Sequence, residues 1–202
     1  MKQKFSRSSP LIGILVLIGA VATNTTPQIS REQGNTLARK IDAINENAAA
    51  KLATPKRTPV NEPEVNSYLA FNIKEKIPRG LTKPQIRMVG DGQLAGRVFV
   101  DMDDFKRGRS SGGMMDPLNY ISGQVPLTAR GVLTTRDGKG RFQLTGAEMN
   151  GVPVPKAVVQ ELVSFFSRTA NNPNGFNLDE PFNLPAKIRE ITVNPGESVV
   201  VQ

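Results

Sequence analysis

The chain has 202 residues, of which 38% are apolar and 5% aromatic, and it contains no His, no Cys and no Trp. The missing Cys excludes disulfides and thiolate chemistry, and the missing His removes Ser-His-Asp and Cys-His catalysis and the commonest transition-metal sites. The formal net charge is +8. This positive charge suits an anionic membrane surface. A nucleic-acid partner has little support, because the bases are spread along the chain and aromatic residues are few.

The first 22 residues have the order of a secretory signal. Lys2, Lys4 and Arg7 precede an apolar run over residues 11–22, which ends in Ala20-Val21-Ala22, a cleavage pattern. About 12 apolar residues at about 1.5 Å each span about 18 Å, less than the hydrocarbon core of about 30 Å. We therefore predict export to the periplasm or the extracytoplasmic face of the cytoplasmic membrane, with a cleaved signal or, alternatively, a retained anchor.

Residues 23–59 are predicted to form a polar helical linker. Ser30 and Gln33 have the spacing of a capping box. Apolar residues then recur at steps of three and four on one thin stripe: Leu37, Ile41, Ile44, Ala48 and Leu52. This stripe favours a marginal, solvent-exposed helix, with a spacer or partner-binding helix as the alternative. Pro55 and Pro59 mark the predicted domain boundary.

The predicted domain covers residues 60–202 and begins with a short helix over residues 61–71. Asn61 is placed to cap it. Two hairpins follow, one from residues 85–89 and 93–103 around Gly90-Asp91-Gly92, the other from residues 123–135 and 141–149. Consecutive hairpins predict an antiparallel sheet. The Gly- and Ser-rich residues 104–116 between them are predicted to form a loop that is either mobile or has a binding role.

Residues 156–169 are predicted to form a helix that is apolar over much of its circumference. An extended connector at residues 182–185 and a terminal hairpin, residues 188–193 with 198–201, complete an α+β fold with helices on one face of the sheet. We expect strands centred on Val98, Phe142 and Val193 to receive the helix. Leu162, Phe165 and Phe166 would then lie nearest to any lipid seam, although ordinary core packing produces the same apolar pattern.

Charged residues cluster after the first hairpin. Asp101, Asp103 and Asp104 could supply oxygen ligands to a hard cation, and we expect Asp101 and Asp103 to share a face of the strand. No calcium-loop spacing follows, however, and three bases come next in the chain: Lys106, Arg107 and Arg109. We expect these bases to pair with the acids, and we predict no metal site.

The same three bases are candidates for contact with lipid phosphates or a membrane surface, together with Lys139 and Arg141 in a neighbouring turn. An ordinary charged loop is the alternative. No nucleophile has an identifiable base, and no glycine-rich phosphate loop precedes a helix. We therefore predict that the protein is not an enzyme and uses no cofactor.

Several segments together resemble a known family. They are an acidic helix start followed by Asn66-Ser67-Tyr68-Leu69, the two hairpins, residues 151–155 (GVPVP) before the apolar helix, and residues 181–185 (PFNLP) before the last hairpin. In this order, residues 60–202 resemble exported bacterial proteins related to the tubular lipid-binding (TULIP-like) superfamily, including small periplasmic phospholipid-binding proteins.

The resemblance implies a strongly curved antiparallel sheet of hairpins packed on one or two helices, here preceded by the signal or anchor segment and the helical tail. It also implies an exported cell-envelope protein that binds phospholipid in an apolar seam between helix and sheet. The alternative is a structural or interaction protein of the envelope with no ligand. The sequence does not identify a protein partner.

Overall fold

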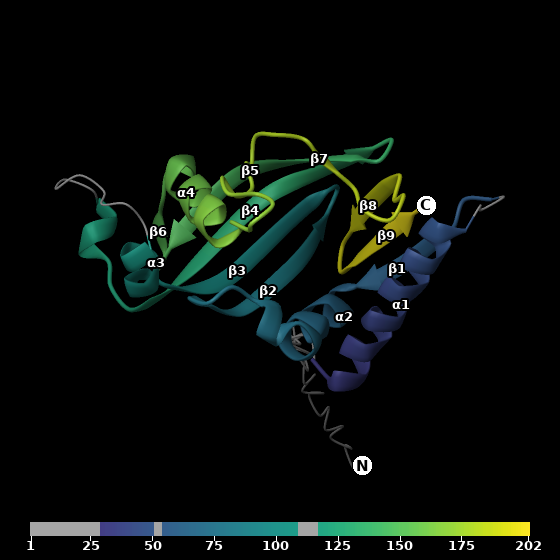
Figure 1. Cartoon of the computed structure of the whole chain (residues 1–202), viewed down its shortest axis with the longest axis horizontal. Helices are drawn as coiled ribbons and strands as arrows, with labels where there is room; N and C mark the ends of the chain where they lie inside the picture. Colours follow the sequence, from purple (N-terminus) through teal and green to yellow (C-terminus); the bar gives the residue numbers. More distant parts are fainter. Residues whose placement is uncertain (1–28, 51–53, 109–116) are drawn as a thin grey trace, which may run out of the picture.

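The computed structural model describes residues 29–50, 54–108 and 117–202 (Figure 1). The α-helices are α1 (Arg31–Ala49), α2 (Glu62–Ser67), α3 (Met102–Gly108) and α4 (Lys156–Phe166). The strands are β1 (Arg57–Asn61), β2 (Leu81–Gly90), β3 (Gln93–Asp101), β4 (Gln124–Arg136), β5 (Lys139–Met149), β6 (Val152–Pro153), β7 (Phe182–Asn183), β8 (Glu190–Asn194) and β9 (Glu197–Val201). The predicted α+β class is confirmed for this part of the chain.

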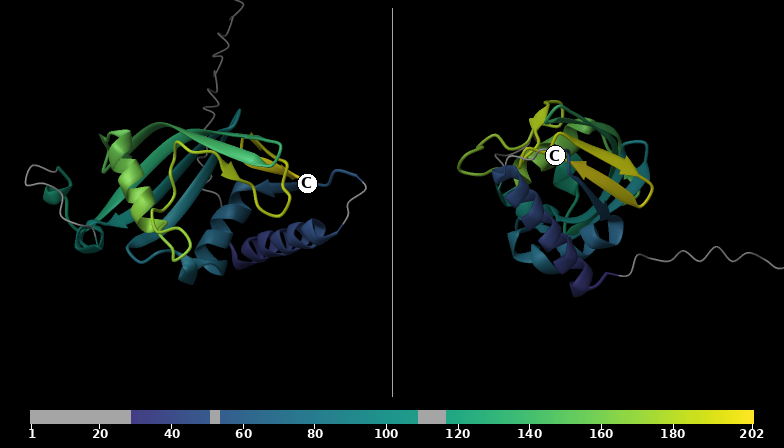
Figure 2. Two further views of the ribbon diagram at one scale, coloured as in Figure 1. Left: turned by 45° about the horizontal axis from the view of Figure 1, so that its top comes forward. Right: turned by 90° about the vertical axis from the view of Figure 1, so that its right-hand side faces the viewer.

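A six-stranded antiparallel sheet dominates the fold, with the order β2-β3-β4-β5-β6 and β7 paired to the far end of β5. Both predicted hairpins are present. Their turns are Asp91-Gly92 and Asp137-Gly138, whose residues all have positive φ, as two-residue type I′ hairpin turns require. Figure 2 shows the sheet curving around the molecule.

The terminal hairpin does not extend this sheet. Strands β8 and β9 join β1 in a separate three-stranded sheet with the order β1-β9-β8. This sheet meets the far end of the large one, where Gly196 N donates to Met88 O (2.9 Å) and Thr135 Oγ1 bonds the backbone of Ile191. The expectation that the strand centred on Val193 receives α4 was therefore wrong, because β8 and α4 lie at opposite ends of the large sheet (Figure 1).

Helix α1 is the predicted linker helix, but it is not the solvent-exposed helix that we expected. Leu37 and Ile44 are buried in a second core with Val60, Ile188 and Val200. The thin apolar stripe is sufficient to bury one side of α1, because the three-stranded sheet supplies the opposing apolar surface. Strand β1 also crosses residue 59, where the sequence analysis placed the boundary between linker and domain.

The caps of α1 and α2 follow the predicted residues. Ser30 Oγ accepts from Gln33 N, and Ser67 completes this cap by accepting from Ser30 N and donating to Gln33 Oε1. At α2, the Asn61 side chain accepts from Glu64 N while Glu64 Oε2 accepts from Asn61 N, a reciprocal capping box. Helix α2 continues as a π-helical turn over Tyr68–Asn72.

Strand β3 ends at Asp101, two residues earlier than predicted, and α3 includes the last two residues of the predicted strand and the first five of the predicted loop. Asp101 Oδ1 accepts from the backbone N–H groups of Asp103 and Asp104 (3.0 and 2.9 Å), so Asp101 caps the helix and does not share a strand face with Asp103. The predicted loop is thus helical up to Gly108. Its remaining residues, 109–116, lie outside the described residues.

Helix α4 packs on one face of the six-stranded sheet, as predicted. Leu162 is 2% exposed in a core that also holds Val100, Met102, Phe105, Leu118, Leu127 and Met149. Val159 packs beside it in a neighbouring cluster with Ala147 and Leu178. The predicted signal, residues 1–22, lies outside the described residues. Among the described helices, none is long and apolar enough to cross a membrane.

Candidate lipid-contact site

Three phenylalanine rings meet where α3 approaches the end of α4. The centroids of Phe105 and Phe165 are 5.0 Å apart with the rings nearly perpendicular, and those of Phe165 and Phe166 have the same spacing and an edge-on arrangement. Phe105 is completely buried, whereas Phe165 and Phe166 are only partly buried. Edge-to-face packing of this kind favours a fixed geometry. The cluster therefore leads from the core to the surface.

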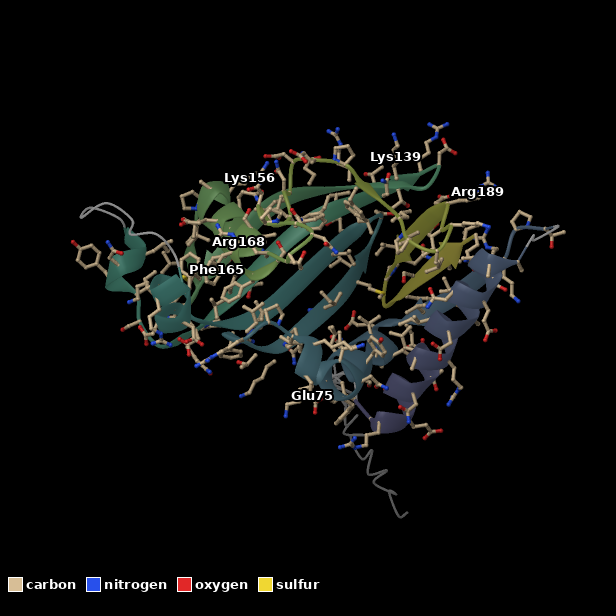
Figure 3. All side chains as sticks on the ribbon, viewed as in Figure 1. Glu75, Lys139, Lys156, Phe165, Arg168 and Arg189 are labelled. Carbon is tan, nitrogen blue, oxygen red and sulfur yellow. The ribbon has the colours of Figure 1, made fainter. Side chains whose placement is uncertain are left out.

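The outer side of the cluster opens into a shallow pocket of about 330 Å³. Its lining residues are Phe165, Arg79, Asp104, Arg107 and Gly108. The Arg168 guanidinium also lies over the Phe165 ring, 5.7 Å from its centroid, and Figure 3 shows both side chains near the end of α4. The pocket thus combines an aromatic wall with a cationic rim.

The charges of this rim are arranged around one carboxylate. Asp104 forms an ion pair with Arg107 and lies 3.5 Å from Arg79 Nε. The Arg79 and Arg107 side chains are 91% and 66% exposed, so water screens both pairs, and each pair contributes little to stability. Two cations share one anion, which leaves net positive charge at the mouth of the pocket.

Two predicted site residues line this pocket together. Phe165 was predicted as a lipid contact and Arg107 as a separate headgroup contact. Leu162 instead lies in the core behind the rings and does not line the pocket. Lys106 does not line it either, because its Nζ donates to Ile121 O (2.8 Å) and lies 3.4 Å from Asp103. Arg109 lies outside the described residues. The expected pairing of acids with neighbouring bases is confirmed for Asp103 and Asp104.

Two further bases that the sequence analysis grouped with this site lie elsewhere. Lys139 and Arg141 follow the β4–β5 turn, and β4 carries the chain on the order of 40 Å away from Gln124 at about 3.4 Å per residue. Figure 3 shows Lys139 far from Phe165. Their inclusion in a shared rim was wrong, because an antiparallel hairpin places its turn at the opposite end of the sheet from its open ends.

Arg79 and Arg168 were not among the residues predicted for this site. Arg79 precedes β2 and reaches the pocket only because β2 begins beside α3, where Gly80 O accepts from Asp101 N (2.7 Å). Arg168 follows the last turn of α4, one turn beyond Ser164 and three residues after Phe165. That helical spacing is the one signal that could have linked Arg168 to the aromatic residues.

The same end of the molecule carries exposed apolar side chains. Tyr120 is 80% exposed and Val152 is 64% exposed, on the turn before β4 and on β6. Strand β6 lies at the end of the sheet where α3 and α4 also lie (Figure 1). Leu118, two residues before Tyr120, packs in the same core as Phe105 and Leu162. Within the described ranges, no group of three acidic residues could hold a metal ion.

No protein family, curated protein or solved structure matches the chain.

Proposed function

We propose that this chain is an exported protein of the bacterial cell envelope that contacts phospholipid at the α3–α4 end. The observation that carries the proposal is the partly buried Phe165 ring, which lines the same pocket as Arg79 and Arg107 and has the Arg168 guanidinium over it. An apolar surface beside cations is complementary to an anionic lipid, whose acyl region and phosphate require those two environments.

The exposed side chains of Tyr120 and Val152 support an orientation on a membrane. Tyrosine is favoured at the membrane–water interface because its ring is apolar and its hydroxyl is polar. Tyr120 and Val152 would enter the interface, while Arg107 and Arg79 would face lipid phosphates. Export, inferred from the order of residues 1–22, would bring this surface to the extracytoplasmic side of the cytoplasmic membrane.

We also propose that the chain is related to the tubular lipid-binding proteins. A curved antiparallel sheet packed against a helix supports it. The seam behind the rings is filled by Leu162 and Val159, so we assign lipid contact to Phe165 and the cationic rim and not to the deep seam. We propose no catalytic activity, on the grounds that the sequence contains neither His nor Cys.

The filled seam also favours the second candidate, a structural or interaction protein of the envelope with no ligand. Val100, Met102 and Phe105 are almost completely buried together with Leu162, as in an ordinary core. The two candidates differ in the role of Phe165. A ligand contact at this ring requires lipid-dependent effects, whereas a purely structural ring does not.

We expect Arg107→Gln to weaken binding to vesicles that contain phosphatidylglycerol about fivefold, since one base near an anionic surface contributes about 1 kcal/mol. Phe165→Ala should weaken it as well, through the loss of apolar contact. Co-sedimentation with vesicles at fixed ionic strength measures both effects.

Arg141→Gln is the matched control, since it removes the same charge at the distant end of the sheet. Binding by the control should equal that of the unmodified protein. If all three variants bind equally well, or if the unmodified protein does not bind, lipid contact at this end is refuted and the structural candidate remains.

Export is tested separately with a reporter. Alkaline phosphatase fused after Gln202 should be active in bacteria, because this enzyme folds only outside the cytoplasm, and deletion of residues 2–22 should abolish its activity. An inactive phosphatase fusion, together with an active cytoplasmic reporter at the same position, would show that the chain is not exported.

A further inference from the structure

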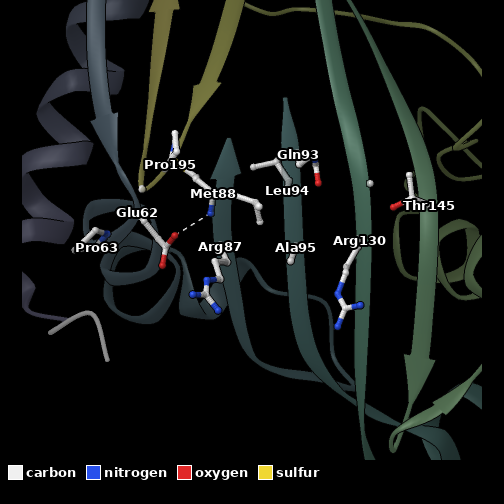
Figure 4. A pocket seen from close by; sticks show the side chains of 13 residues that line it. Glu62, Pro63, Arg87, Met88, Gln93, Leu94, Ala95, Arg130, Thr145 and Pro195 are labelled. Atoms are coloured by element: carbon white, nitrogen blue, oxygen red, sulfur yellow. Dashed lines mark hydrogen bonds between the residues drawn. The ribbon is translucent and has the colours of Figure 1, made fainter. Parts of the chain in front are cut away.

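A larger hollow of about 650 Å³ lies away from the aromatic pocket, beside the junction of the two sheets. Arg87, Ala95 and Arg130 line it from β2, β3 and β4. The β8–β9 turn contributes Pro195 and Gly196. Figure 4 shows the two arginine side chains on either side of Ala95, extending from their strands in the same general direction.

Strand register explains why these side chains converge. Arg87 is opposite Ala95, and Ala95 is opposite Arg130, so the three residues form one row across three strands. Val98 faces the core under α4, and Ala95, three positions earlier on the same strand, therefore points to the opposite face. The row lies on the face of the sheet that α4 does not cover.

Ala95 provides the space between the two arginines. Alternate strands of a sheet are about 10 Å apart, twice the spacing of about 4.8 Å between neighbours. A long side chain at position 95 would fill the gap, whereas the methyl group of alanine leaves it open. Two guanidinium groups can therefore approach one ligand from opposite sides.

The positive charge of the row is only weakly compensated. Among the described residues, no carboxylate lies within 4.0 Å of the Arg87 guanidinium, and Arg130 has a distant, exposed partner, with 3.9 Å between its Nη1 and Glu148 Oε1. Glu62 also lines the hollow, but its Oε2 accepts from Met88 N (2.8 Å) and is held at the edge of β2. A bound anion would therefore meet two guanidinium groups whose charges are not fully paired.

We propose that this hollow binds a phosphate group, carried either by a soluble phosphorylated molecule or by a phospholipid headgroup. A guanidinium offers paired N–H donors that match two phosphate oxygens, and two guanidiniums balance a doubly charged phosphate. The Gln93 amide and the Thr145 hydroxyl, which also line the hollow, can donate further hydrogen bonds. This inference does not rest on the lipid-contact proposal, because no residue is shared between the two pockets.

The proposal is tested by titrating the unmodified full-length chain with inorganic phosphate and with pyrophosphate in a calorimeter, at constant ionic strength. We expect binding of both, and tighter binding of pyrophosphate, since two linked phosphates can engage both arginines at once. Arg87→Gln and Arg130→Gln should each lower the affinity at least tenfold. Arg141→Gln, an exposed arginine of the same sheet outside the hollow, should leave it unchanged.

A second arm identifies the source of the phosphate. Vesicles of phosphatidic acid and phosphatidylcholine present the group on a lipid, and binding that depends on Arg87 and Arg130 in this arm assigns a headgroup. Dependence in the soluble arm alone assigns a soluble phosphorylated ligand. The proposal is overturned if neither arm shows binding, or if the Arg87 and Arg130 variants bind as well as Arg141→Gln. Their far-UV circular dichroism should match that of the unmodified chain, because both positions are exposed.

Discussion

Replacing Phe105 by alanine is expected to lower the free energy of unfolding by about 3–5 kcal/mol. The ring is 0% exposed, and it contacts both Phe165 and Phe166 from α3. Its removal would leave a cavity between α3 and α4 that the surrounding strands cannot fill. Urea unfolding, followed by far-UV circular dichroism, measures the loss as a lower midpoint with an unchanged m-value.

Phe165→Ala is the matched control for this change. The same number of atoms is removed, but the ring is partly exposed and lines the surface pocket, so the loss should be less than half of that for Phe105→Ala. Equal losses would show that Phe165 is a core residue like Phe105 and would weaken its assignment as a lipid contact. Small losses in both variants would contradict the packed ring cluster itself.

The elements that the sequence predicted well are those with local signals. Helix α4 has apolar residues over several turns, and each large hairpin has an Asp-Gly turn between alternating strands. The Asn61 cap also follows from nearby residues, because Glu64 stands three positions later. In each case the determining contacts lie within a few residues of one another.

Helix α3 was missed for a local reason. It has only seven residues, Met102–Gly108, too few to show helical periodicity, and the alternation of β3 appeared to continue through Met102. Asp101 was the available signal, since an aspartate before a short acidic turn is a favourable cap. The neighbouring carboxylates of Asp103 and Asp104 are equally typical of a cation site, so the sequence does not single out this capping role.

The packing of α1 and both pockets depend on contacts between distant parts of the chain. Leu37 is buried by strands that include β9, more than 150 residues later. Arg87 and Arg130 belong to different hairpins, and the register between β3 and β4 is set across more than twenty intervening residues. The alternation of apolar and polar residues shows which side chains share a face of one strand. It does not show the register, that is, which residues of the neighbouring strand lie opposite them.

The outer edge of β2 provides the second prediction with a large effect. Edge strands carry unpaired backbone groups that promote association with other chains. Here the Asn66 side chain takes the place of a neighbouring strand, since its Nδ2 donates to Ile86 O (2.9 Å) and its Oδ1 accepts from Ile86 N (2.8 Å). Glu62 and Gly196 bond the backbone of Met88 two residues later.

Asn66→Ala is expected to cost about 2–6 kcal/mol of stability, because it leaves the backbone N–H and C=O of Ile86 without their partners, at about 1–3 kcal/mol for each group. Chemical denaturation measures this loss. Sedimentation velocity should show concentration-dependent association, because the outer edge of β2 can then pair with another chain. Asn72→Ala is the control, since it removes only an exposed bond to Asn35 and should cost less than about 0.5 kcal/mol. The prediction fails if Asn66→Ala remains monomeric and loses no more stability than this control. Water would then hydrogen-bond the Ile86 N–H and C=O in place of Asn66, and Asn66 would not be needed to prevent association at this edge.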